Sequence, residues 1–229
     1  MKKIKKLVSR NELVKQLPHN AVIAEIGVAR GDFSQVILTN AFPRKLHLID
    51  AWEYQDKSIY PETVNPQRNS QKKQIQNYNF VLQRFNQQIQ KGQVILHKGY
   101  SADVLKKFPD HYFDWVYIDA NHQYKFVKED LELCRLKVKE EGLICGHDYC
   151  EGNPIVGINY GVIQAVNEFC EKYGWEIVCL ADHFWGGINF KSYVLVKDEM
   201  YDFYNKKFNN FLRLNLFNIK LKIKKYFGL

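Results

Sequence analysis

The chain has 229 residues, of which 46% are hydrophobic, a size and composition typical of one globular domain with short additions. No apolar run is long enough to span a membrane, and the charged start MKKIKKLVSR lacks the apolar core of a secretion signal, so we expect a cytoplasmic protein. The net charge of +8 lies in the two ends, whereas residues 11–200 carry more acidic than basic side chains. This distribution argues against a dedicated nucleic-acid groove across the body.

Residues 1–19 are predicted to form a basic segment and a helix ahead of the main domain, which covers residues 20–197. In this domain, apolar runs of strand length alternate with helical patterns. The predicted strands cover residues 21–26, 46–49, 94–96, 115–118, 143–145, 177–180 and 193–196, and the predicted helices cover residues 33–39, 71–90, 102–107, 126–138 and 161–172. The alternation favours an α/β fold with a seven-stranded, mostly parallel sheet and helices on both faces. Because no helix separates the last two strands, we expect them to form an antiparallel pair at one edge.

Two loops leave the carboxyl ends of predicted strands, where open α/β sheets bind their ligands. Residues 51–70 are polar and contain two prolines, which predicts a long loop. This loop is either a lid over the site or a segment that projects into solvent. Residues 149–160 form the second loop, after the fifth strand. We expect both loops to contribute to ligand specificity.

Residues 198–229 are predicted to form a basic amphipathic tail, since apolar side chains such as Phe208, Leu212 and Leu216 recur at helical spacing. A basic helix of this kind suits peripheral contact with an acidic membrane surface or with a partner subunit, including a second copy in a homodimer. A helix that packs on its own domain is the alternative.

A glycine-punctuated turn, AEIGVARGDFS, follows the first strand of the main domain. Gly27 and Gly31 let a ligand approach the backbone N–H groups and the start of the next helix. Asp50 ends the second strand, where an acid accepts hydrogen bonds from ribose hydroxyls. Glu25 before the turn would repel a pyrophosphate but suits a ligand with an amino group. These residues predict a cofactor that contains a nucleoside but is not a nicotinamide dinucleotide.

The turn resembles the first motif of the class I S-adenosylmethionine-dependent methyltransferases, E/D-x-G-x-G-x-G, with Ala29 in place of the middle glycine. We expect this alanine to cost little if its φ is negative. The segments HKGYSADVL and YIDANHQYKFVKEDL resemble the small-molecule O-methyltransferase branch that includes the macrocin and catechol enzymes. The resemblance implies a Rossmann-like fold and S-adenosylmethionine as the cofactor. The cofactor-binding residues that it implies are Glu25, Gly27, Gly31, Asp50, Ser101, Ala102 and Asp119.

Ser101 is also expected as the cap of the following helix, and Asp119 also suits a helix N-cap. Because Asp119 follows four apolar residues at the end of a strand, its carboxylate should point into the ligand crevice. The segment GLICGHDY places His147 and Asp148 at the end of the next strand.

Related metal-dependent methyltransferases bind a divalent ion with acidic residues at these strand ends, which implies a metal site at Asp119, His147 and Asp148. Oxygen ligands suit Mg²⁺, the first expectation, and a histidine also admits Mn²⁺, Fe²⁺ or Zn²⁺. His122 or His147 is the expected proton acceptor, so that Asp119, His122 and His147 form the predicted catalytic set. A mechanism with a histidine base and no metal is the alternative.

We therefore predict methyl transfer from S-adenosylmethionine to a hydroxyl group of a small molecule, such as a sugar or a natural-product intermediate. Methylation of a nucleic acid or a protein is a second reading of the sequence, with the basic tail as an arm. A binding protein that uses the same fold without methylation is a third.

Overall fold

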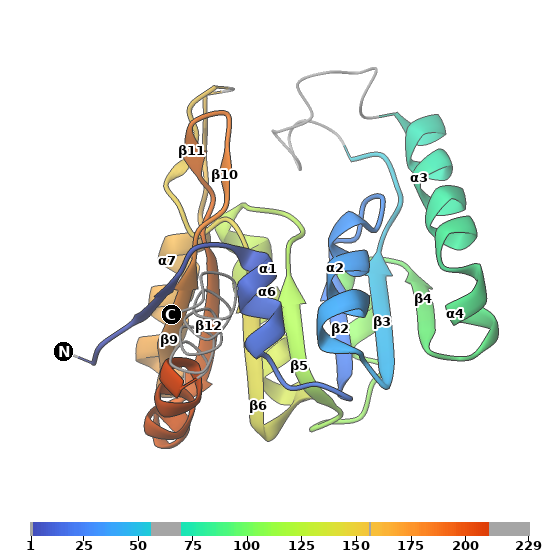
Figure 1. Ribbon diagram of the computed structural model, residues 1–229. Coiled ribbons are helices and arrows are strands. Elements are labelled where there is room, and N and C mark those ends of the chain that lie inside the picture. The colour runs from blue at the N-terminus through green and yellow to red at the C-terminus, as the bar shows by residue number, and fades with distance from the viewer. Residues whose placement is uncertain (1, 56–69, 156, 211–229) are drawn as a thin grey trace, which may run out of the picture.

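The computed structural model describes residues 2–55, 70–155 and 157–210. In these ranges, eight strands form a central sheet in the order β1-β9-β12-β6-β5-β2-β3-β4 (Figure 1). Strand β12 runs antiparallel to its neighbours β9 and β6, and the other pairs are parallel. The bounds are β1 Lys5–Leu7, β2 Val22–Ile26, β3 Lys45–Asp50, β4 Val94–Lys98, β5 Phe113–Ile118, β6 Val138–Gly146, β9 Trp175–Ala181 and β12 Ser192–Lys197.

The mostly parallel α/β architecture is confirmed, with each of the seven predicted strands in place. Strand β1 is an addition, because three residues of the N-terminal segment pair in parallel with β9. The predicted antiparallel pair of β9 and β12 therefore lies one strand in from the edge.

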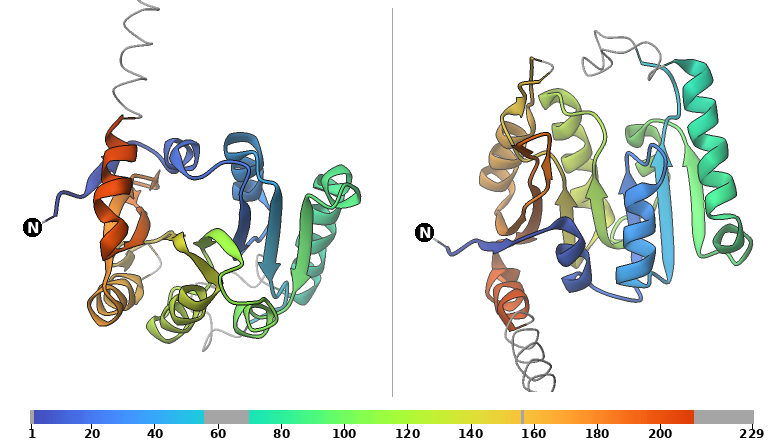
Figure 2. Two further views of the ribbon diagram at one scale, coloured as in Figure 1. Left: turned by 90° about the horizontal axis from the view of Figure 1, so that it is seen from below. Right: turned by 45° about the horizontal axis from the view of Figure 1, so that its top comes forward.

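Helices cover both faces of the sheet (Figure 2). Helices α1, α2 and α3 and the helical residues 201–210 pack on one face, and α5, α6 and α7 pack on the other. The predicted helix at residues 71–90 is divided at Phe85, which is fully buried, into α3 and α4. The bounds are α1 Arg10–Gln16, α2 Asp32–Ala41, α3 Gln71–Arg84, α4 Asn86–Gln90, α5 Ser101–Leu105, α6 Tyr124–Lys137 and α7 Val162–Tyr173.

The carboxyl ends of four parallel strands meet at one edge of the sheet, which is uppermost in Figure 1. Backbone hydrogen bonds hold these ends together: Gly27 N donates to Ile49 O at 2.9 Å, Asp119 N to Ile26 O at 2.7 Å, and His147 N to Ile118 O at 2.9 Å. The residues that follow β2, β3, β5 and β6 are therefore neighbours, as parallel pairing requires.

Two short hairpins rise from the same edge (Figure 1). One pairs β7 (Gly152–Asn153) with β8 (Ile158–Asn159), within the predicted loop at residues 149–160. The other pairs β10 (Phe184–Trp185) with β11 (Ile188–Asn189). The predicted long loop at residues 51–70 lies mostly outside the described residues.

Both ends of the described chain pack on the domain. Leu13 and Val14 of α1 are fully buried in the core, as is Phe208 of the helical residues 201–210. The Tyr201 hydroxyl donates to Lys3 O at 2.7 Å, which joins the two ends directly. Within residues 201–210 the tail is therefore a helix packed on its own domain; the rest of it lies outside the described residues. No helix in the described ranges is long and apolar enough to cross a membrane.

Candidate active site

The glycine turn after β2 has left-handed backbone at three positions: Gly27 (φ 86°), Ala29 (φ 49°) and Gly31 (φ 72°). A Cβ atom on Gly27 would lie 2.0 Å from Asp119 O, so that the turn and the end of β5 pack too closely for any larger residue. The expectation of a negative φ at Ala29 is wrong. Ala29 has left-handed backbone at the middle position, where the motif that the turn resembles has glycine.

Asp50 organises this turn. Its Oδ2 accepts hydrogen bonds from Val28 N at 2.8 Å and Ala29 N at 2.9 Å, and its Oδ1 accepts one from Trp52 N at 2.7 Å. The Trp52 indole N–H donates to Ala29 O at 3.0 Å. A carboxylate has about four acceptor positions, so these three bonds leave Asp50 one position on Oδ1 for a ligand hydroxyl.

Glu25 lies beneath the turn, and only 1% of it is exposed. The Ser34 hydroxyl of α2 donates to its carboxyl group. Burial raises the pKa of Glu25 to about 8 against the lowering effect of that hydrogen bond, and the nearby charge of Asp119 adds to the rise. Near neutral pH the Glu25 carboxyl is therefore largely protonated.

Ser101 and Ala102 begin α5 beside the end of β3, since Gly99 N donates to Asp50 O at 2.9 Å. The predicted cap is shifted by one residue: Tyr100 occupies the N-cap position, and Ser101 is the first residue of the helix. Burial raises the pKa of Asp130 of α6 to about 7, and the neighbouring Ser101 side chain partly offsets that rise. Both Ser101 and Ala102 are partly exposed at the carboxyl end of β4.

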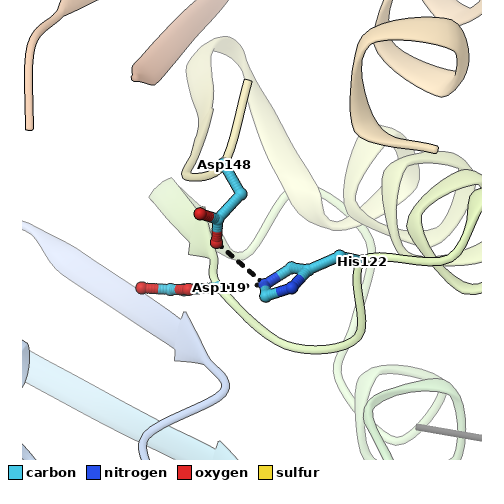
Figure 3. Close-up of side chains that lie close together, drawn as sticks. All are labelled: Asp119, His122 and Asp148. Carbon is cyan, nitrogen blue, oxygen red and sulfur yellow. Dashed lines mark ion pairs between the residues drawn. The ribbon is translucent and has the colours of Figure 1, made fainter. Parts of the chain in front are cut away.

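Asp119, His122 and Asp148 converge at the ends of β5 and β6 (Figure 3). One ligand atom from each lies within 4.8 Å of the others, the kind of grouping that can hold a metal ion. The Nε2 atom of His122 is 2.8 Å from Asp148 Oδ2 and 3.9 Å from Asp119 Oδ1. The Nδ1 atom of His147 is 3.0 Å from Asp148 Oδ2 and 3.7 Å from Asp119 Oδ1. The predicted catalytic and metal residues are therefore neighbours.

Asp148 is the centre of this cluster, and 5% of it is exposed. Burial would raise the pKa of its carboxyl group, but hydrogen bonds from His122 and His147 outweigh burial and hold the pKa well below its usual range. Because an ionised carboxylate only accepts hydrogen bonds, each imidazole presents an N–H to Asp148. The basic nitrogen of a neutral His122 is therefore Nδ1.

Three further residues at this edge were not predicted from the sequence. His183 Nδ1 lies 2.8 Å from His147 Nε2, the Tyr160 ring lies 4.6 Å from the His122 ring, and Arg10 Nη1 lies 3.6 Å from Asp119 Oδ2. A local signal exists for Arg10: Ser9 and Glu12 form the S-x-x-E pattern of a helix start, and Ser9 Oγ accepts from Glu12 N at 3.2 Å. That signal places Arg10 at the start of a helix but does not show which part of the sheet the helix covers.

Comparison with known proteins agrees with this geometry. Residues 24–149 match a family model described as a methyltransferase domain. No curated protein matches the sequence significantly.

Three solved structures illustrate the similarity in fold. A tRNA methyltransferase of B. subtilis, TrmK, is 13% identical over 87% of this chain and 71% of its own, with a TM-score of 0.56. A SAM-dependent methyltransferase from Aquifex aeolicus is 13% identical over 83% of this chain and 90% of its own, with a TM-score of 0.54. A precorrin-6y methyltransferase from Geobacter metallireducens is 14% identical over 82% of this chain and 86% of its own, also with a TM-score of 0.54.

At these identities the solved structures show a shared fold, and the family model covers more than half of the sequence. The chain belongs to the class I S-adenosylmethionine-dependent methyltransferase family.

Proposed function

We propose that the protein transfers the methyl group of S-adenosylmethionine to a hydroxyl group of a small-molecule acceptor. The observation that supports this most is the cluster of Asp119, His122 and Asp148 directly beside the glycine turn. Methyl transfer needs an oxygen nucleophile in line with the sulfonium methyl group, and such positioning can lower the barrier by about 7 to 11 kcal/mol. The cluster stands where it would hold and deprotonate that oxygen.

The cofactor would lie across the carboxyl ends of β3, β2 and β5. Asp50 has one acceptor position left for a ribose hydroxyl, and Ser101 and Ala102 border the same end of the crevice. Gly27 and Gly31 supply the left-handed backbone of the turn, and no side chain projects from either position. Glu25 would act from beneath, as support for the turn, because it is buried against Ser34.

The donor atoms of the cluster fit a divalent cation. Asp119 and Asp148 offer carboxylate oxygens, and His122 or His147 offers an imidazole nitrogen. A mixed oxygen and nitrogen set favours Mn²⁺, Fe²⁺ or Zn²⁺ over Mg²⁺, which prefers oxygen alone. An ion bound there would lower the pKa of a coordinated hydroxyl group.

The side chains also provide a route that needs no cation. Asp148 holds the His122 N–H at Nε2 and would stabilise the imidazolium that forms when Nδ1 accepts a proton. His183 supports the arrangement from behind His147: burial, followed by the charge of Arg10, lowers the pKa of His183 to about 4. His183 is therefore neutral at physiological pH and adds no positive charge to the cluster.

The two hairpins would form the acceptor side of the site. A series of ring contacts leads outward from His122, through Tyr160 and Phe190, to Trp185, with ring centroids 4.6, 6.5 and 6.4 Å apart. Trp185 is 59% exposed, and its neighbour Phe184 is 66% exposed. This aromatic surface suits an acceptor whose hydroxyl group is attached to a ring or another apolar body.

Turnover with methyl-labelled S-adenosylmethionine tests the proposal. A panel of catechols and glycosides is offered as acceptors, and the product is identified by mass spectrometry after chelation and after Mn²⁺, Mg²⁺ or Zn²⁺ is added back. We expect the wild type to O-methylate an acceptor, and the rate to fall at least tenfold in Asp119→Asn and in His122→Ala. His19→Ala changes an exposed histidine outside the cluster and should leave the rate unchanged.

Chelation separates the two routes. Activity that is lost in chelator and restored by a divalent ion supports the metal, whereas full activity in chelator that disappears in His122→Ala supports the histidine base. Methylation of RNA or protein, with no small hydroxyl acceptor modified, would contradict the proposed acceptor class.

A further inference from the structure

Arg10 of the N-terminal segment lies beside the candidate site, next to Asp119. The pairing of Lys5, Lys6 and Leu7 with β9 makes this segment the edge strand of the sheet. Helix α1 then begins at Arg10, after the Ser9 cap, and packs against α2. The first residue of α1 therefore lies next to the end of β5, more than one hundred residues away in sequence.

The guanidinium group of Arg10 is held in place by two contacts. It lies 4.6 Å from the centroid of the Phe33 ring, which is buried at the start of α2, directly after the glycine turn. Its Nη1 atom is 3.6 Å from Asp119 Oδ2, a distance too long for a hydrogen bond. Since guanidinium has five N–H donors in a fixed fork, Arg10 is stacked in position with donors available to a ligand.

The charges around Arg10 favour an anionic ligand group. Asp119 has ion-pair contacts with Arg10, His122 and His147, and among these described partners Arg10 is the permanent cation. Glu25 is buried and its pKa is raised to about 8, so that it competes weakly for the guanidinium near neutral pH. S-adenosylmethionine has one anionic group, the carboxylate of its methionine end.

The order of the strands gives the direction of the cofactor. Asp50 at the end of β3 would take the ribose, and the methyl group must face the cluster after β5. The methionine end then extends from the glycine turn of β2 towards the side of Asp119 where Arg10 lies. We propose that Arg10 binds the carboxylate of the methionine end through its guanidinium fork. This inference rests on the proposed cofactor.

Calorimetry with two ligands tests this role. S-adenosylmethionine and its decarboxylated form differ only in the carboxylate, and both are titrated into the full chain. We expect the wild type to bind the complete cofactor about 10- to 100-fold more tightly, as one charge-assisted contact would give. Arg10→Gln should remove that difference, with affinity for the decarboxylated form almost unchanged.

Two variants serve as controls. Arg10→Lys keeps the charge without the fork and should retain part of the difference. Lys15→Gln removes an exposed charge from the same helix and should behave as the wild type.

The inference is overturned if Arg10→Gln weakens both ligands equally, since the residue would then act through the fold, or if it weakens neither. In both cases the wild type still binds S-adenosylmethionine, so that the proposed function stands. Failure of the wild type to bind either ligand would overturn the proposed function as well.

Discussion

Ala29 occupies a backbone conformation that favours glycine. With φ at 49°, its Cβ approaches the following carbonyl group, which costs about 1 to 2 kcal/mol for an L-residue. The Asp50 carboxylate and the Trp52 indole each hydrogen-bond its backbone, and these bonds hold the residue in the strained region. The turn therefore depends on Asp50 as well as on glycine.

Replacement of Ala29 by glycine should stabilise the protein. Relief of the strain outweighs the greater entropy of glycine in the unfolded chain, and we expect the free energy of unfolding to rise by about 0.5 to 1 kcal/mol. Chemical denaturation measures this change. Ala102→Gly, within helix α5, is the matched comparison and should lower stability by about the same amount. If both substitutions lowered the free energy of unfolding equally, the backbone of Ala29 would not be strained.

Glu25 gives the stability a pH dependence of known sign. Its pKa is 4.5 ordinarily and about 8 in the folded protein, because burial disfavours the charged carboxylate. Below pH 4.5 the group is protonated in both states. Above that pH the unfolded chain ionises while the folded protein retains its proton, so the free energy of unfolding falls as the pH rises towards 8.

The substitution Glu25→Gln should remove this contribution. The difference in the free energy of unfolding between the variant and the wild type should grow by about 2 to 4 kcal/mol in favour of the variant as the pH rises from 5 to 8. Denaturation without cofactor measures this difference. Glu171→Gln, an exposed glutamate on α7, should show no such gain. If the free energy of unfolding of the wild type and of Glu25→Gln changed with pH in parallel, the Glu25 carboxyl group would not be held protonated in the folded protein.

Among the elements, the hairpin of β10 and β11 exposes large apolar side chains beside the site. Trp185 and Phe184 are both more than half exposed, and the hairpin begins directly after His183. We expect Trp185→Ala to raise the KM for the acceptor about tenfold, as loss of one aromatic contact would. The dissociation constant for S-adenosylmethionine should stay unchanged.

Phe203→Ala provides the control, since Phe203 is equally exposed but lies on the helical residues 201–210, away from this edge. A higher KM in both variants would point to a general loss of stability. An unchanged KM in Trp185→Ala would place the acceptor elsewhere.

The elements themselves were largely predictable. Each predicted strand of the main domain is present because short apolar runs separated by helical patterns leave few alternatives in a parallel sheet. Strand β1 was missed because three residues, Lys5–Leu7, carry no alternating pattern of their own and are fixed by pairing with β9. The division of the helix at Phe85 was missed for a similar reason, since it depends on the burial of that ring.

The same contrast holds for the candidate site. Asp119 and Asp148 could be placed together from sequence, because each follows a strand in a sheet whose parallel strands end at one edge. His183 and Arg10 could not be placed, since their positions depend on the antiparallel pairing of β12 and on the packing of α1. The direction of the Asp50 carboxylate towards Val28 and Ala29 likewise follows from the folded turn.

On the scale of the whole molecule, the two ends of the described chain complete one domain. The N-terminal segment places Arg10 beside Asp119, and the Tyr201 hydroxyl donates to Lys3 O in that segment. The Tyr204 hydroxyl donates to Glu141 O of β6 at 2.8 Å. The two ends, as far as the structure describes them, are thus part of the frame around the candidate site.

Calorimetric titration with S-adenosylhomocysteine shows whether the glycine turn, Asp50 and the cluster at Asp119 form a binding site for S-adenosylmethionine. We predict saturable binding at one site per chain, weakened roughly tenfold or more in Asp50→Ala, which loses both the ribose acceptor and the bonds that shape the turn. Titration with NAD⁺ should give no binding. Binding of NAD⁺ with none of S-adenosylhomocysteine would contradict the account.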